Sequence, residues 1–370
     1  MNIRDIAKLA GVSVASVSRA INGKDPEKVS ARTREKILRI CEQQRFSPNG
    51  HMRRLSERRA NTVAFLVPAI NHYGEGVTPR MDDNMSAAIL GAEEELSPSS
   101  TFLTLATLSE SFLAAKTYLE FHRNRTIDGI LVWGWEGGDY LHELIAEGVP
   151  TVLLQGEAEG TPLSSVSPED REGMSMLVDH LVGQGHRRIA VVTPLLSGSI
   201  GRERRRGILD ALQAHGLAPA WVSRTMGYTA EVGYQACQEI LAHAPETTCI
   251  MASNDLAALG VIKAARERGL DVPGQLSVTG ADGVAFHGLV DLTTYASPSY
   301  AIGRAAARLL LKVVETPERE PEHVKVGVNF MPGATVAKPA ASRASDRGKP
   351  IRSEQTSVST RNRRKQETSP

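Results

Sequence analysis

The residues able to perform covalent or metal chemistry do not gather into a recognisable site in this sequence. The ten histidines are dispersed, and the three cysteines, Cys41, Cys237 and Cys249, have no CxxC spacing and no histidine nearby. The sequence lacks a GxSxG nucleophile motif, a P-loop and a GxGxxG after a predicted strand. We therefore expect neither an enzyme nor a bound metal or cofactor. Cysteines used in this way are typical of a reducing, cytosolic compartment.

Positive charge is concentrated at the two ends of the chain. The net charge is +1, yet residues 1–60 hold 14 Lys or Arg against 6 Asp or Glu, and residues 337–370 hold 9 against 3. The stretch between them must then carry a net charge of −13. A basic head on an acidic body is typical of a protein that binds a polyanion at one end. On charge alone, a solvated basic surface is an equally good interpretation.

Helical spacing of apolar residues predicts three short helices in the basic head. Gly11 would supply the first turn, and Ser13 and Ser30 are good N-caps for the second and third helices. The residues expected to face the core are Ile3, Ile6, Ala7, Ala10, Val17, Ile21, Ile37 and Cys41. Helices spaced in this way make a helix-turn-helix, which places the second helix in the major groove of DNA. The outward residues of that helix are Val14, Ala15, Ser18 and Arg19.

The body of the chain alternates short β-branched runs with amphipathic stretches, which predicts βαβ units around parallel sheets. The predicted strands are 63–67, 102–106, 129–133, 151–154, 189–192, 249–252 and 276–280. The predicted helices are 84–96, 111–124, 138–147, 171–184, 203–215, 230–243 and 255–268. The block occurs twice, at 63–154 and 189–280, and two such lobes would hold a ligand at the carboxyl ends of their strands. One continuous sheet is the alternative.

Three segments of the head occur in the order of a known family. They are DIAKLAGVSVASVSRAING, VSARTREKI and FSPN, with Leu55 shortly after. In these segments the head resembles the lactose-repressor/galactose-repressor (LacI/GalR) family of bacterial regulators. The resemblance implies base contacts by Val14, Ala15 and Arg19, and phosphate contacts by Ser13, Ser16, Asn22, Ser30 and Thr33. Arg19 can donate a bidentate pair to guanine, which discriminates by roughly 1–3 kcal/mol. The alternative role for the Ser and Asn side chains is plain helix capping.

The stretch after the third helix resembles the hinge of this family. The resemblance implies a hinge helix over 46–59 that inserts Leu55, with Met52 beside it, into the minor groove and kinks the duplex. Two residues depart from the family pattern. Gly50 is a poor helix former, and Met52 stands where the family usually has alanine, so its bulk is expected to alter the kink.

The resemblance continues through the body to residue 336, on segments such as DGILV, GHRRIAVV, SNDLAALGVIKAARERGLDVP and LSVTGADG. It implies an α/β fold like that of periplasmic binding proteins, with two Rossmann-like lobes closing on an effector. The implied effector-binding residues are Trp133, Gln155, Arg204, Tyr228, Asn254 and Asp282. Trp133 and Tyr228 are suited to stacking on sugars, although core packing is the alternative for both. Gln155 departs from the Asp that sugar-binding members often have.

These expectations describe a sequence-specific DNA-binding transcription regulator, expected to be a repressor, whose operator affinity a small molecule controls. A sugar or polyol is the expected effector, with a nucleoside or other metabolite behind it; whether it releases or recruits the protein stays open. The partners would be double-stranded DNA with a pseudo-palindromic operator and a second copy of the chain. A regulator that has lost ligand control and a sugar-processing protein are the alternatives.

The expected domains are a helix-turn-helix over 1–45, the hinge over 46–59, the two-lobed domain over 60–336, and a disordered basic tail over 337–370. The N-terminus has charges where a signal peptide needs an apolar run, and the apolar run at 63–70 is too short to span a bilayer. We therefore expect neither export nor a membrane segment, and a cytoplasmic protein.

Overall fold

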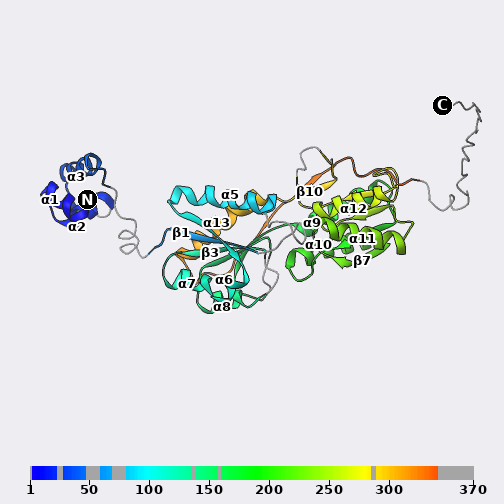
Figure 1. Cartoon of the computed structure of the whole chain (residues 1–370), viewed down its shortest axis with the longest axis horizontal. Helices are drawn as coiled ribbons and strands as arrows, with labels where there is room; N and C mark the ends of the chain where they lie inside the picture. Colours follow the sequence, from blue (N-terminus) through cyan, green and yellow to red (C-terminus); the bar gives the residue numbers. More distant parts are fainter. Residues whose placement is uncertain are drawn as a thin grey trace, which may run out of the picture.

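The computed structural model of the chain describes residues 2–22, 28–46, 59–68, 81–134, 138–156, 160–284 and 289–340. Three bodies lie in a row in space (Figure 1). The first is a helical head. The second is a lobe that contains α5 (Asp83–Leu96) and α13 (Ser299–Glu315), and the third is a lobe that contains α11 (Ala230–His243) and α12 (Asp255–Glu267). None of the described helices is long and apolar enough to cross a membrane.

The head consists of α1 (Ile3–Ala10), α2 (Val14–Asn22) and α3 (Ala31–Gln43). Gly11 turns the chain between α1 and α2 with a φ of 67°, a left-handed conformation that suits glycine. The core that joins the three helices contains Ile6, Ala7, Ala10, Val17, Ala20, Val29, Ile37 and Cys41, with Ile3 and Ile21 packed against it. The predicted three-helix head and its core face are thereby confirmed.

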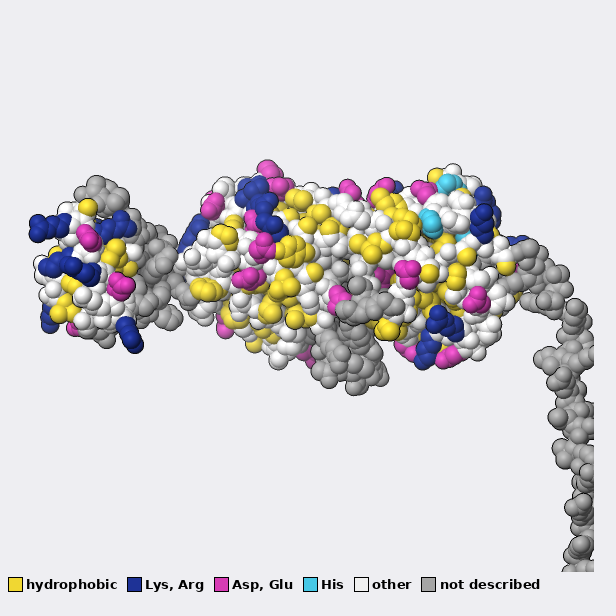
Figure 2. All heavy atoms as spheres, turned by 90° about the horizontal axis from the view of Figure 1, so that it is seen from above, with side chains coloured by type: hydrophobic (Ala, Val, Ile, Leu, Met, Phe, Trp, Pro, Cys, Tyr) yellow, Lys and Arg dark blue, Asp and Glu magenta, His cyan; other side chains and the backbone are white. Residues whose placement is uncertain are grey.

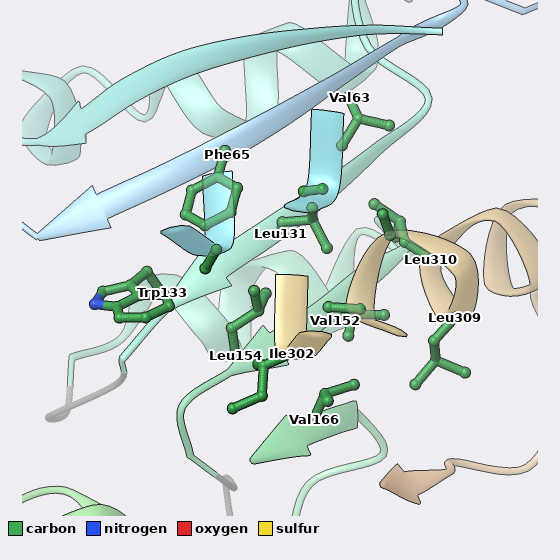
Figure 3. Close-up of a cluster of buried hydrophobic side chains, with 14 of the residues drawn as sticks. Val63, Phe65, Leu131, Trp133, Val152, Leu154, Val166, Ile302, Leu309 and Leu310 are labelled. Carbon is green, nitrogen blue, oxygen red and sulfur yellow. The ribbon is translucent and has the colours of Figure 1, made fainter. Parts of the chain in front are cut away.

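The first lobe is built on a parallel sheet with the strand order β11-β5-β4-β3-β1-β2. Its strands are β1 (Thr62–Pro68), β2 (Phe102–Leu108), β3 (Gly129–Trp133), β4 (Thr151–Leu154), β5 (Ser164–Pro168) and β11 (His323–Val326). Helices α5 and α13 pack on one face of this sheet, where Phe65, Leu131 and Ile302 lie in one apolar cluster (Figure 3). On the other face lie α7 (Thr117–Arg123) and α8 (Tyr140–Ala146). The strands β1, β3 and β4 are buried on both faces and read as continuous apolar runs.

The second lobe repeats this arrangement around a parallel sheet with the order β7-β6-β8-β9. Its strands are β6 (Ile189–Thr193), β7 (Trp221–Met226), β8 (Cys249–Met251) and β9 (Ser277–Thr279). Helices α9 (Asp170–Gly183) and α10 (Ser199–Ala214) cover one face, and α11 and α12 cover the other. A separate antiparallel pair joins β10 (Thr294–Ala296) to β12 (Asn329–Met331). The described strands of the two lobes form separate parallel sheets, so the alternative of one continuous sheet is wrong.

The chain passes between the lobes three times. It leaves the first sheet after β5 to enter α9, returns from β10 into α13, and leaves again from β11 into β12. The first lobe is therefore completed by residues far along the chain. Assigning the lobes to the contiguous blocks 63–154 and 189–280 is wrong in this respect, because α13 and β11 belong to the first lobe.

Most predicted elements lie within a few residues of the observed ones, and β3, β4 and α11 match to the residue. The helix predicted over 111–124 is wrong as a single element. Lys116 has a φ of 50°, and this left-handed residue separates α6 (Glu110–Ala114) from α7. The sequence pattern also omits β5, β7, β10, β11, β12 and α13. The strands among these alternate or lack large apolar side chains, so they do not read as apolar runs.

Candidate functional site

Helix α2 presents one face to solvent and the other to the head's core. Val17 and Ala20 are buried, whereas Val14 is 41% exposed and the Ala15 and Arg19 side chains are also exposed. The three residues predicted to contact bases thus lie on the solvent side of a short helix that a rigid core holds in place. Figure 2 shows Lys and Arg side chains spread over the visible face of this head. This arrangement can enter a DNA groove.

The predicted phosphate contacts lie at two exposed helix starts. The Ser13 hydroxyl accepts a hydrogen bond from the Ser16 backbone N–H at 3.1 Å, and their hydroxyl oxygens are 2.9 Å apart. The Ser30 hydroxyl accepts from the Thr33 N–H at 3.2 Å, and these two hydroxyl oxygens are 2.8 Å apart. Ser13 and Ser30 therefore cap their helices, and the Ser16 and Thr33 hydroxyls hydrogen-bond to the capping hydroxyls. A capped, exposed helix N-terminus is also a site for anions such as phosphate, so the two roles are compatible.

Part of the predicted DNA interface lies outside the described residues. The side chain of Asn22, and both Met52 and Leu55 with the rest of 47–58, belong to this part. The phosphate contact by Asn22 and the minor-groove contacts by the hinge stay predictions.

Arg204, on α10, is the centre of the polar cluster in the second lobe. The side chain is buried, its Nε donates to Asp170 Oδ1 at 2.9 Å, and its Nη2 donates to Asp282 Oδ1 at 2.5 Å. Its Nη1 donates to the carbonyl of Ser253 at 3.0 Å, and the guanidinium lies 5.7 Å from the centroid of the Tyr295 ring. Burial alone would lower the pKa of Arg204, but the two carboxylates hold it well above its ordinary value.

Asp282 sits in a constrained loop directly after β9. Its φ of 121° is rare for a residue with a side chain. Asp255, at the start of α12, supports this loop: it accepts from the backbone N–H of Val284 at 2.7 Å and from Thr294 Oγ1 at 2.6 Å. Burial raises the pKa of both Asp255 and Asp282. Repulsion between the two carboxylates adds to the pKa of Asp255, whereas Arg204 offsets part of the rise at Asp282.

The first lobe contributes neutral polar groups on the other side. Gln155 follows β4, is buried, and its Nε2 donates to Ser299 Oγ at 3.2 Å. The Ser299 hydroxyl in turn donates to Asn84 Oδ1 at 2.9 Å. The lobes approach closely beside this cluster, since a Cβ added to Gly156 of the first lobe would come within 2.9 Å of Ser199 Oγ at the start of α10.

Trp133, Tyr228 and Asn254 also lie at the carboxyl ends of strands, after or at the end of β3, β7 and β8. Trp133 is mostly buried and stacks on Phe65, with ring centroids 6.4 Å apart; its nitrogen points away from the other labelled side chains of the cluster (Figure 3). Tyr228 is half-buried and contributes to the raised pKa of Arg204. Asn254 caps α12 by accepting from the Ala257 N–H at 2.8 Å. The structure therefore gives Trp133 and Asn254 a structural role whatever else they bind.

Sequence reasoning missed the partners of these residues. Asp170 accepts from both Arg204 and the Tyr295 hydroxyl, and neither it nor Tyr295, Asp255 or Ser299 was among the predicted site residues. The missing signal for Asp170 is strand β5, whose sequence SSVSP has one large apolar residue. A recognised strand would have placed the following Asp at its carboxyl end, where ligands bind in such sheets.

Comparisons with known proteins agree with this architecture. Residues 2–49 match the family of bacterial regulatory proteins called the lacI family, and residues 178–336 match the periplasmic binding protein-like domain. The transcriptional regulator MalR of Streptomyces coelicolor is 31% identical over 364 residues, covering 94% of this chain and 99% of that protein. The probable transcriptional repressor ExuR of Bacillus subtilis is 26% identical and covers 90% of this chain and 97% of its own length.

Solved structures show the same fold. A complex of the regulator CelR with cellobiose is 27% identical, covers 90% of this chain and 99% of that chain, and superposes with a TM-score of 0.66. The lac repressor dimer bound to operator and an anti-inducer is 22% identical, covers 91% and 99%, and reaches a TM-score of 0.76. The curated relatives are regulators and repressors rather than enzymes. The chain belongs to the lacI family of bacterial regulatory proteins, and it is a DNA-binding transcription regulator.

Proposed function

We propose that this regulator reads a pseudo-palindromic operator with α2. A sugar-like effector held between the lobes raises or lowers its affinity for that operator. One observation carries the proposal. An exposed face with Val14, Ala15 and Arg19 is joined in one chain to a two-lobed body whose buried cluster, centred on Arg204, lies at the carboxyl ends of the strands. A fold of this kind binds ligands at that edge.

The proposed base readers divide into one hydrogen-bonding and two apolar side chains. Arg19 supplies donors for guanine, whereas Val14 and Ala15 can only contact thymine methyls and exclude poorly fitting bases. Ser13, Ser16, Asn22, Ser30 and Thr33 fix the register through phosphates. The hinge over 46–59 adds a minor-groove contact through Leu55 and Met52. The other proposed domains are the helix-turn-helix over 1–45, the effector and dimerisation domain over 60–336 and the basic tail over 337–370. The first residue of the tail, Ala337, still accepts a hydrogen bond from His186.

The donors and acceptors around Arg204 suit a polyhydroxylated effector. Carboxylates such as Asp282 accept from hydroxyl groups, and Gln155, Asn84 and Ser299 can accept or donate. Tyr228 and Trp133 supply aromatic surface for the apolar faces of a sugar. The solved complex of the relative CelR contains cellobiose, which supports a sugar as the effector.

A second copy of the chain is the proposed protein partner. Phe102 and Leu105 on β2, an edge strand of the first sheet, are 67% and 48% exposed, and Leu90 of α5 is 63% exposed. Met226 on β7, an edge strand of the second sheet, is 50% exposed. Exposed apolar side chains at sheet edges favour association. A homodimer would cover them and align two heads on two half-sites; such a regulator would act in the cytoplasm, where bacterial DNA is accessible.

Effector control follows from linkage between the two sites. A ligand that favours one arrangement of the lobes changes operator affinity by its differential binding to the two arrangements. Couplings of this kind are typically about 1–3 kcal/mol, or about 5- to 150-fold in affinity.

Selection of bound DNA from a random pool tests the proposal most directly. The full chain is first screened by thermal shift against cellobiose, ribose, other sugars and nucleosides, and the selection is run with and without any compound that stabilises it. Recovery of a palindromic site whose enrichment changes with that compound supports the proposal. Recovery of no palindrome contradicts it. A palindrome with no stabilising compound would instead identify a regulator without ligand control.

A further inference from the structure

The positive charge of Arg204 is already paired with carboxylates inside the protein. All three of its guanidinium nitrogens donate to protein acceptors, and two of these acceptors are the carboxylates of Asp170 and Asp282. The guanidinium side chain is only 5% exposed, and the Tyr295 ring lies against it. Arg204 therefore has little attraction to offer to an anionic ligand.

Negative charge exceeds positive charge in the described part of this cluster. Asp255 lies behind Asp282, buried, with its carboxylate bound by a hydroxyl and a backbone N–H rather than by a cation. The negative charge of Asp82, which caps α5 in the first lobe, raises the pKa of Asp282 further. The groups that the first lobe adds, Gln155, Ser299 and Asn84, are neutral.

We propose that the effector site between the lobes (the cleft) selects uncharged or ammonium-bearing polyhydroxylated effectors and rejects their carboxylated and phosphorylated counterparts. The inference rests on the proposed effector site and names the chemical class that it takes. An added carboxylate would face Asp170, Asp282 and Asp82, while the Arg204 guanidinium is already paired. A hydroxyl or ammonium group in the same place would donate to Asp282.

Matched sugars test this selection on the full-length chain. Glucose with glucuronate and glucosamine, galactose with galacturonate and galactosamine, and cellobiose with cellobionate are compared by thermal shift and titration calorimetry at pH 7.5. Where a skeleton binds, the acid is expected to bind at least about tenfold more weakly than the neutral or amino form, a difference of about 1.4 kcal/mol. An acid that binds as tightly as its neutral parent overturns the inference.

The same Asp→Asn change, made inside the cleft and elsewhere on the surface, distinguishes an effect of the cleft from a general effect of charge. In Asp82→Asn the cap of α5 is kept, because asparagine is also a good N-cap, and one cleft charge is lost. The acid-to-neutral affinity ratio is expected to rise at least threefold in Asp82→Asn and in Asp282→Asn. The control is Asp210→Asn, whose exposed carboxylate pairs with Arg171 on the outer face of α10; its ratio should not change. An unchanged ratio in both cleft variants overturns the inference.

The outcomes distinguish this inference from the proposed function. If no sugar of any charge binds, the sugar effector itself is wrong and the selection inferred here falls with it, whereas recovery of an operator from random DNA would leave the DNA-binding role in place. If acids bind best, the effector site stands and only its charge selection is wrong.

Discussion

Arg19 is the residue on which direct base recognition is expected to depend most. It is exposed on α2, next to two apolar readers that cannot replace its hydrogen bonds. Arg19→Ala should weaken binding to the selected operator by about 1–3 kcal/mol, or about 5- to 150-fold, with a much smaller effect on random DNA. Fluorescence anisotropy at fixed salt measures both.

Arg39→Ala is the matched control, because Arg39 is an exposed arginine on α3 of the same head. Removing a charge there should weaken binding to the operator and to random DNA to a similar, small extent. Equal losses on both DNAs for Arg19→Ala would mean that Arg19 contacts phosphate rather than a base.

His186 is expected to make stability depend on pH. Its Nε2–H donates to the Ala337 carbonyl, so its Nδ1 must accept from the Thr248 hydroxyl, and both distances are 2.9 Å. Burial lowers the pKa of His186. The unfolded chain binds a proton at this histidine with the ordinary pKa of about 6.5, whereas the folded chain binds it less tightly. The free energy of unfolding therefore falls as the pH drops below that value.

Urea unfolding at pH 7.5 and 5.5 checks this, with His186→Gln as the variant that does not titrate. The wild type should lose more stability on acidification than the variant. Asp255 and Asp282 act in the opposite direction, because their pKa values are raised in the folded chain, but they do so equally in both proteins. A variant that loses as much as the wild type would contradict the assignment.

At the residue scale, Arg204 and Asp282 could be proposed as effector-binding residues because the segments that contain them resemble the family pattern. Asp170 and Tyr295 could not be proposed in this way, because their roles come from contacts between distant residues. Asp170 binds Arg204, 34 residues away, and Tyr295 binds Asp170, 125 residues away. The hydrogen bond between Gln155 and Ser299 likewise joins side chains that are 144 residues apart in the sequence.

At the scale of elements, the contact between α5 and α13 depends on two glycines. A Cβ on Gly91 would lie 2.1 Å from the Tyr300 carbonyl oxygen, and one on Gly303 would lie 2.0 Å from that of Ala88. Backbone atoms cannot move aside without separating the helices. Gly303→Ala should therefore destabilise the chain by about 1–3 kcal/mol, although alanine favours a helix by about 1 kcal/mol.

Gly183→Ala is the control, because Gly183 ends α9 and a Cβ there would meet nothing within 4 Å. Its stability in urea should be unchanged or slightly higher than that of the wild type. If Gly303→Ala were as stable as Gly183→Ala, the close packing of α5 on α13 would be wrong.

The same scale shows which elements a sequence pattern can reveal. Strands buried on both faces, such as β3 and β4, are continuous apolar runs and were predicted to the residue. Strand β2 lies at a sheet edge, β5 has one large apolar side chain, and β11 alternates, so their patterns weaken in that order. The return of α13 to the first lobe could not be predicted from local periodicity, because it is a property of the chain path.

At the scale of the whole molecule, operator binding should depend on the association of two chains. Phe102→Asp with Leu105→Asp places two charges on the exposed edge of β2 without removing a buried side chain. We expect this double variant to sediment as a monomer at concentrations where the wild type is a dimer. Its affinity for a full operator should fall to that of a single half-site, because binding of the second head is no longer linked to the first.

Leu289→Asp is the control for this variant: Leu289 is 86% exposed and belongs to the segment between β9 and β10, not to β2 or β7. It should leave both sedimentation and operator affinity unchanged. A double variant that stays dimeric would place the interface elsewhere, whereas a monomer that keeps full operator affinity would show that the two heads bind independently. Only loss of both together means that the lobes hold the two heads in register, which is what effector control through those lobes requires.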